Sequence, residues 1–142
     1  MGADQNIQIV LREGLKNFSL DTGIVSRIDE NKYVVYSCES NGEGFASGTE
    51  FELQDSYCSD VVRTRKTCFY KDVSEISEML KHPCYLNTQL RAYIGTPVYV
   101  DGVLWGTLNY SSLYPRKLDY TNEEIQFLES QAKVISCFLP GK

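Results

Sequence analysis

Histidine is nearly absent from this sequence, and its scarcity removes several classes of site. His82 is the single histidine, which excludes HExxH metalloprotease motifs and clusters of several histidine ligands. A Ser-His-Asp relay would have to use His82, yet no GxSxG motif is present to expose a serine. We expect His82 to lie at a pocket rim or on the surface.

Cysteine is present, but not in the spacing that zinc sites or disulfide frameworks use. There are five cysteines, an odd number, and no CxxC pair. No apolar run approaches the roughly 18 to 20 residues that cross a bilayer, and charged residues interrupt the N-terminal stretch where a secretory signal would be apolar. The sequence indicates reduced thiols and a cytoplasmic location, with no cofactor, no metal and no membrane partner.

An excess of basic charge is also missing. The formal net charge is -5, which disfavours a binder of the phosphate backbone, so we expect no nucleic-acid partner. Gly42, Gly44 and Gly48 are not followed by the Gly-Lys-Ser/Thr of a phosphate loop, and they indicate a mobile loop instead.

What is present is an ordinary globular composition. Hydrophobic residues make up 42% and charged residues 23% of the 142 positions, which suits a chain that buries one core. A length of this order is typical of one domain. We therefore interpret residues 1–142 as a single domain.

Hydrophobic periodicity predicts the elements of the first half. Apolar residues at steps of three and four over 7–18 predict a helix with one buried face. Runs rich in β-branched and aromatic residues at 23–28 and 32–38 predict a hairpin, and a short strand follows at 49–53.

The middle of the chain has weaker signals. We expect a helix over 56–66, a strand over 67–73, and a helical stretch from 74 to 80 that Pro83 interrupts or ends. A loop or a short helix then leads to Leu90.

The strongest local signal is a hairpin that turns at Asp101-Gly102. This dipeptide tolerates the positive φ angles of a two-residue turn, and it joins strand-like runs at 93–100 and 103–112. Ideal pairing would place Asn109 on the same face as Ile94, but Pro97 cannot donate to the ladder. We therefore expect a bulge near Pro97.

The chain ends with an expected long helix. Thr121 and Glu124 match a capping box, and an apolar seam runs from Ile125 to Leu139. The order helix, strands, helices, strands, helix predicts an α+β fold with an antiparallel sheet and segregated helices.

These segments resemble a GAF domain, the regulatory module of many sensor kinases, cyclases and phosphodiesterases. Residues 90–112 and 120–136 are similar to its second half, and 23–35 and 51–62 are similar to its first half in the right order. The resemblance covers about residues 15–135. It implies a GAF-like (PAS-like) antiparallel sheet of about six strands, with N- and C-terminal helices on one face. Short helices and loops would cover a small-molecule pocket on the other.

One branch of the family is enzymatic, the free methionine-(R)-sulfoxide reductases. By this resemblance Cys58 and Cys84 lie where reductase cysteines lie, so both are candidate catalytic residues in this alternative. The reductase carboxylates, however, fall at Tyr93, Asn109 and Ser111, which cannot carry the charge that polarises a sulfoxide. This absence favours a non-enzymatic domain.

A covalent bilin is a second cysteine hypothesis. The PCYL segment around Cys84 resembles the attachment segment of phytochrome-like photoreceptors, but Tyr85 stands where a histidine is usual. We therefore expect no bilin.

The sequence holds ten tyrosines, and several fall in the segments that would surround a GAF pocket. Each could equally be an ordinary strand residue. Arg91 could pair with an anionic ligand or with a nearby carboxylate. The candidate ligand-binding residues are Tyr57, Cys58, Asp72, Tyr85, Arg91, Tyr93, Asn109 and Ser111.

The sequence thus predicts a sensory or regulatory domain that binds an unknown small molecule between its sheet and the segments from Ser56 to Leu90. We expect a homodimer formed through the terminal helices. A third possibility is a domain with a collapsed pocket that only dimerises, which would be favoured if Tyr93 and its neighbours filled the pocket.

Overall fold

The computed structural model of the protein describes residues 2–141 and contains one six-stranded antiparallel sheet. The strand order is β3-β2-β1-β6-β5-β4. The strands are β1 (Thr22–Asp29), β2 (Lys32–Ser40), β3 (Glu50–Glu52), β4 (Cys68–Tyr70), β5 (Ala92–Val100) and β6 (Val103–Ser112). The expected α+β fold is confirmed.

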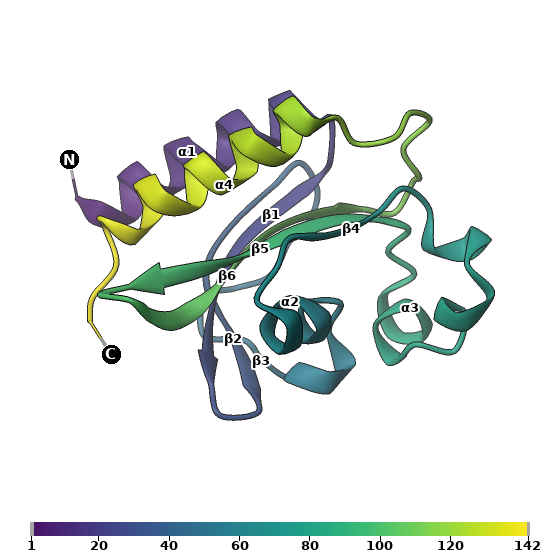
Figure 1. Ribbon diagram of the computed structural model, residues 1–142, viewed down its shortest axis with the longest axis horizontal. Coiled ribbons are helices and arrows are strands. Elements are labelled where there is room, and N and C mark those ends of the chain that lie inside the picture. Colours follow the sequence, from purple (N-terminus) through teal and green to yellow (C-terminus); the bar gives the residue numbers. More distant parts are fainter. Residues whose placement is uncertain (1, 142) are drawn as a thin grey trace.

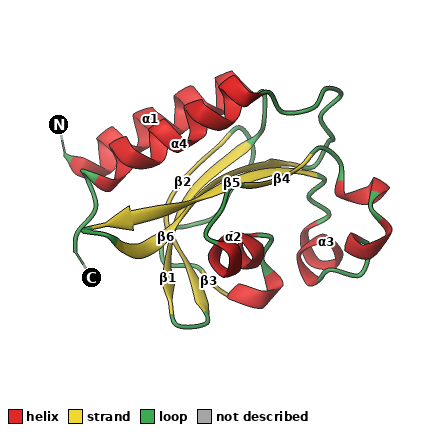
Figure 2. Ribbon diagram, in the orientation of Figure 1, coloured by secondary structure: helices red, strands yellow, loops and turns green. Residues whose placement is uncertain are grey.

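Helices of two kinds cover the two faces of the sheet (Figures 1 and 2). The long terminal helices α1 (Ala3–Phe18) and α4 (Asn122–Ser136) lie side by side on one face. The short helices α2 (Cys58–Thr64) and α3 (Pro83–Thr88) lie on the other. No helix within residues 2–141 has the length and apolar character needed to cross a membrane.

The helix face is closed by apolar packing and one buried polar clamp. Tyr110 of β6 donates its hydroxyl to Gln131 Oε1 of α4 at 2.7 Å, and Gln131 Nε2 donates to the Val10 carbonyl of α1 at 2.9 Å. Gln131 therefore joins α4 to the sheet and to α1, and both the oxygen and the nitrogen of its buried amide have a hydrogen-bond partner. The capping box at Thr121 and Glu124 starts α4 as expected.

The register of the β5–β6 hairpin contains the expected bulge, one position beyond Pro97. Val98 pairs with Gly106 and Tyr99 with Leu104, so Trp105 is the extra residue. Beyond the bulge Ile94 pairs with Tyr110, not with Asn109. The face predicted for Asn109 from ideal pairing was therefore wrong. Asn109 lies on the opposite side of the sheet from Ile94.

The expected helix over 74–80 is also wrong. Two 3-10 turns, Val73–Glu75 and Ser77–Met79, replace it, with Ile76 in extended conformation between them. The Asp72 carboxylate accepts from the Ser74 amide at 3.0 Å, a local bond that competes with continuous helix. Pro83 begins α3 instead of ending a helix.

Gly106 marks the closest approach of two strands. A Cβ at this position would overlap the backbone oxygen of Ser26 on β1, which cannot move without breaking the β1–β6 ladder.

We expect Gly106→Ala to lower the free energy of unfolding by about 1–3 kcal/mol, as for other overpacked cores. Urea denaturation would measure it. Gly42→Ala, with nothing closer than 3.9 Å, is the matched control and should be near neutral. An unchanged midpoint for Gly106→Ala would refute this account of the sheet.

Candidate functional site

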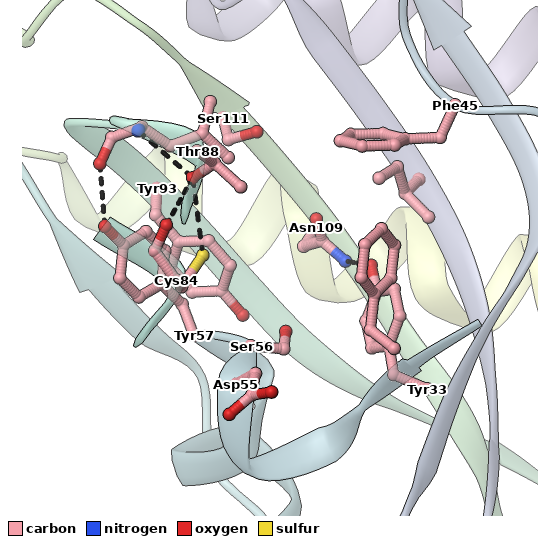
Figure 3. A pocket seen from close by; sticks show the side chains of 13 residues that line it. Tyr33, Phe45, Asp55, Ser56, Tyr57, Cys84, Thr88, Tyr93, Asn109 and Ser111 are labelled. Atoms are coloured by element: carbon pink, nitrogen blue, oxygen red, sulfur yellow. Dashed lines mark hydrogen bonds between the residues drawn. The ribbon is translucent and has the colours of Figure 1, made fainter. Parts of the chain in front are cut away.

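A small cavity lies between the sheet and the segments that cover its second face (Figure 3). Its volume is about 60 Å³. The residues that line it are Ile24, Tyr33, Phe45, Phe51, Asp55, Ser56, Tyr57, Cys84, Thr88, Leu90, Tyr93, Asn109 and Ser111. The sheet and the Ser56–Leu90 segments therefore meet here, where the sequence placed the pocket.

The floor of the cavity is polar because of the bulge in β6. Strand alternation after Trp105 turns Asn109 and Ser111 to this face, beside Tyr33 of β2. Asn109 Nδ2 donates to the Tyr33 hydroxyl at 2.9 Å (Figure 3). It also donates to Thr107 Oγ1 at 3.4 Å. Both amide hydrogens thus have acceptors, and the side chain is held in one orientation.

The opposite wall is built from α3 and the turn before α2. The Tyr57 hydroxyl donates to the Leu90 carbonyl at 2.7 Å, which ties the end of the α3 segment to α2. The Thr88 hydroxyl donates to the Cys84 carbonyl at 2.6 Å and accepts from the Leu90 amide at 3.2 Å. These bonds hold the wall in place without using any group of the floor.

Tyr93 fills the space between wall and floor. Its side chain is buried and packs against the rings of Tyr57 and Tyr70, with centroids 5.4 Å and 6.0 Å away. Its hydroxyl lies 2.9 Å from Cys58 Sγ. Tyr93 therefore takes up volume that a larger ligand would need.

Cys58 lies behind Tyr93 and does not line the cavity. The Thr107 hydroxyl donates to its sulfur at 3.3 Å, and the residue is 1% exposed. Burial raises the pKa of the Cys58 thiol to about 11. The thiol therefore stays protonated at neutral pH, which is the unreactive form.

Asp72 and Arg91 form an ion pair outside the cavity lining. Arg91 donates Nε and Nη2 to the two carboxylate oxygens of Asp72 at 3.0 and 2.7 Å. The hydrogen bonds from Arg91, with others from Ser74, lower the pKa of Asp72 to about 2. Of the two roles considered for Arg91, the structural pairing is the one that the geometry contains.

Tyr85 is partly buried against the pocket-side core without lining the cavity. Cys84 does line it, as Tyr57, Tyr93, Asn109 and Ser111 do. The ligand-binding roles of these residues stay predictions. His82 caps α3 by accepting the Cys84 amide at Nδ1.

Several lining residues escaped the sequence reasoning. Tyr33, Phe45 and Phe51 come from the β2–β3 region, which approaches the cavity only through sheet pairing. Asp55 and Thr88 also line it, and neither belongs to a motif. Tyr33 and Val35 alternate in burial with Val34 and Tyr36, but all four are apolar or aromatic, so the sequence does not indicate which of them face the cavity.

A protein-family model, described as GAF domain, matches residues 2–138. The chain belongs to the GAF domain family. The match spans both terminal helices and the whole sheet, as the sequence resemblance implied. No curated protein matches this GAF domain.

Solved structures of several GAF proteins share the fold. The GAF domain from an Acinetobacter phosphoenolpyruvate-protein phosphotransferase superposes with a TM-score of 0.77 at 13% identity, covering 97% of this chain and 82% of that one. The blue-light absorbing form of the Thermosynechococcus elongatus PixJ GAF domain gives 0.74 at 18% identity, covering 95% and 83%.

An enzyme is among the similar structures. The free methionine-R-sulfoxide reductase of Neisseria meningitidis, in complex with its substrate, gives a TM-score of 0.72 at 16% identity, covering 96% of this chain and 77% of that one. At these identities the likeness concerns the fold alone. The family thus supports a sensory or ligand-binding domain, and the side chains must decide between sensor and enzyme.

The depressed pKa of Asp72 makes a prediction about stability and pH. A carboxyl group with a lower pKa in the folded state stabilises the fold above its ordinary pKa, and this contribution is lost as the pH falls towards the folded value. Asp72→Asn should therefore lower the urea midpoint at pH 7, and its difference from the wild type should shrink between about pH 4 and about pH 2.

The control for this change is Asp119→Asn, which removes an exposed carboxylate paired with Lys71 and should have little effect. A difference between wild type and Asp72→Asn that is constant with pH would contradict the assigned ion pair.

Proposed function

We propose that this GAF domain is a non-enzymatic sensory or regulatory module that binds a small molecule in the cavity of Figure 3. The observation that carries the proposal is the polar floor. Within residues 2–141, Asn109 Oδ1 and Ser111 Oγ have no hydrogen-bond partner, although both residues are more than 95% buried. Among the described residues the one fully buried side-chain atom without a partner is Trp105 Nε1, so Asn109 Oδ1 and Ser111 Oγ are accessible atoms of the cavity lining, where water or a ligand can bond to them.

The cavity is small for a ligand site. Typical small-molecule pockets hold roughly 300–1,000 Å³, and 60 Å³ is about the liquid volume of two water molecules. Tyr93 and its neighbours do fill much of the space, which is the condition stated for a collapsed pocket. The unpaired atoms of the floor favour a binding site. In a pocket that had simply packed shut, we would expect these acceptors to be paired within the protein.

A way for ligands to enter supports the same proposal. A depression of about 440 Å³ under the 42–45 loop adjoins the cavity and shares Phe45, Thr88 and Leu90 with it. A ligand that binds in the cavity would extend into this depression.

The reductase alternative is disfavoured by the same geometry. Cys58 is buried behind Tyr93 as a protonated thiol, while Cys84 reaches the cavity with a pKa that burial also raises. Sulfoxide attack requires a thiolate with access to the substrate. No carboxylate takes the place of Tyr93, Asn109 or Ser111.

The signalling surface belongs to α1 and α4. Ile9 and Val134 are 37% and 48% exposed on these helices, and Cys137 is exposed just beyond α4. We include in the proposal a homodimer that buries this strip, so that a ligand signal reaches the partner through the terminal helices.

Native mass spectrometry of the protein purified from its own host tests ligand and dimer together. We expect a dimer that carries a small-molecule adduct. Asn109→Leu should lose the adduct because it fills the polar floor, and Val134→Glu should give a monomer because it places charge in the interface.

Two variants serve as controls for that experiment. Tyr99→Leu changes an exposed ring away from the cavity and should keep the adduct, and Leu86→Glu changes an exposed side chain on α3 and should keep the dimer. An adduct that survives Asn109→Leu, or a wild-type monomer at micromolar concentration, would contradict the corresponding part of the proposal.

The enzymatic alternative has its own assay. We expect no NADPH-coupled reduction of free methionine-(R)-sulfoxide above a no-protein blank when a thioredoxin system is supplied. Cys58→Ser and Cys84→Ser should give the same rate as the wild type. Turnover that either substitution abolishes would overturn the non-enzymatic assignment.

A further inference from the structure

The floor of the cavity offers a hydrogen-bond acceptor and no spare amide donor. Asn109 has two N–H groups, of which one points to the Tyr33 oxygen (Figure 3) and the other to Thr107 Oγ1. Its orientation is set from below, since the Thr107 hydroxyl gives its own proton to Cys58 and can only accept from Asn109. Oδ1 is therefore the atom left for a ligand.

The opposite wall also offers few free hydrogen-bond donors. The hydroxyl protons of Tyr57 and Thr88 are donated to the carbonyls of Leu90 and Cys84, so neither is available to the cavity. Among the described lining residues, the hydroxyls of Ser56, Ser111 and Tyr33 have no acceptor of their own, and each can accept as well as donate. A ligand that brings donors of its own satisfies this cavity better than one that brings acceptors.

The charge of the lining has one sign. Asp55 contributes a carboxylate that has no ion pair and no hydrogen bond within the described residues, and no lysine, arginine or histidine lines the cavity. Burial is the main cause of the raised pKa of Cys84, and the Asp55 carboxylate on the same lining raises it further. The nearest candidate cations are unsuitable, because Arg91 is paired with Asp72 and burial lowers the pKa of His82.

The remaining lining is largely aromatic. Tyr33 packs on Phe51, and Phe45 packs on Phe51 in turn, with ring centroids 6.0 and 5.5 Å apart. Tyr57 and Tyr93 face them across the cavity (Figure 3). Aromatic rings attract cations at their faces, where the negative side of the ring quadrupole lies.

We propose that the ligand of this pocket is a small protonated primary amine. Its ammonium group donates to Asn109 Oδ1, the Asp55 carboxylate balances its charge, and its short apolar part lies among the aromatic rings. The inference rests on the proposed function, since it names the chemistry of the same site. Carboxylates and phosphates are excluded as ligands, because no cation in the lining would neutralise them.

Calorimetric titration of the full chain with three probes of similar size tests the inference: ethylammonium, ethanol and acetate. We expect ethylammonium to bind about tenfold or more tighter than ethanol, the equivalent of about 1.4 kcal/mol, and acetate not to bind. Asp55→Asn should remove this preference, about tenfold in affinity for ethylammonium, without changing that for ethanol. Asp60→Asn, a carboxylate that pairs with Arg63 outside the cavity, should change neither.

The outcomes distinguish failure of the amine proposal from failure of the proposed small-molecule binding. Acetate or ethanol binding as tightly as ethylammonium, or Asp55→Asn binding ethylammonium like the wild type, would overturn the amine and leave a ligand pocket. A host-derived adduct whose mass is that of an acid would do the same. If no probe binds and the host protein carries no adduct, both proposals fail. The comparison of probes on the wild-type protein decides the question even if a variant does not fold.

Discussion

The one-residue bulge at Trp105 decides the chemistry of both faces of this GAF domain. It reverses the alternation of β6, so that Leu108 and Tyr110 face the terminal helices while Asn109 and Ser111 face the pocket. Without it a regular hairpin from Asp101-Gly102 would turn every later side chain to the other side. The Asn109 amide would then meet the apolar residues of α1 and α4, where it would have no partner. The bulge also buries the Trp105 Nε1 atom, which has no hydrogen-bond partner among the described residues.

The polar groups of the two faces are arranged differently, although Trp105 Nε1, which lacks a partner among the described residues, lies on the helix side. On the helix side every polar atom of the Gln131 clamp is used, which suits a permanent interface between sheet and helices. On the pocket side the Ser26, Thr107 and Cys58 groups form a closed network beneath the cavity, whereas the atoms above it are left over. The layer beneath the cavity holds Asn109 in one orientation, and under the proposed function its free acceptor, Oδ1, recognises the ligand.

Sequence patterns predicted those parts of the fold that depend on interactions between residues close together in the chain. The Asp101-Gly102 turn, with φ of 53° and 78°, and the Thr121 capping box depend on residues within four positions of one another. The pocket depends on pairs far apart in the chain: Ser26 meets Thr107 across 81 positions and Tyr33 meets Asn109 across 76. No local pattern encodes such pairings, so Tyr33, Phe45 and Asp55 went unnoticed. The prediction of a helix over 74–80 was wrong for another reason. The Asp72 side chain accepts a hydrogen bond from the Ser74 amide, and hydrophobic periodicity gives no sign of such a bond.

The position of Cys58 shows why fold and function separate in this family. The backbone matches a reductase with a TM-score of 0.72, and a cysteine stands at the matching place in the sequence. Yet Tyr93 stands where the resemblance calls for an acid, and its hydroxyl lies 2.9 Å from the sulfur of Cys58, which is 1% exposed. Burial raises the pKa of Cys58 to about 11, although the hydrogen bonds from Thr107 and Tyr93 act in the opposite direction. Under the proposed function, this chain keeps the GAF cavity without the reductase chemistry, and the Asp55 carboxylate sets the ligand preference of that cavity.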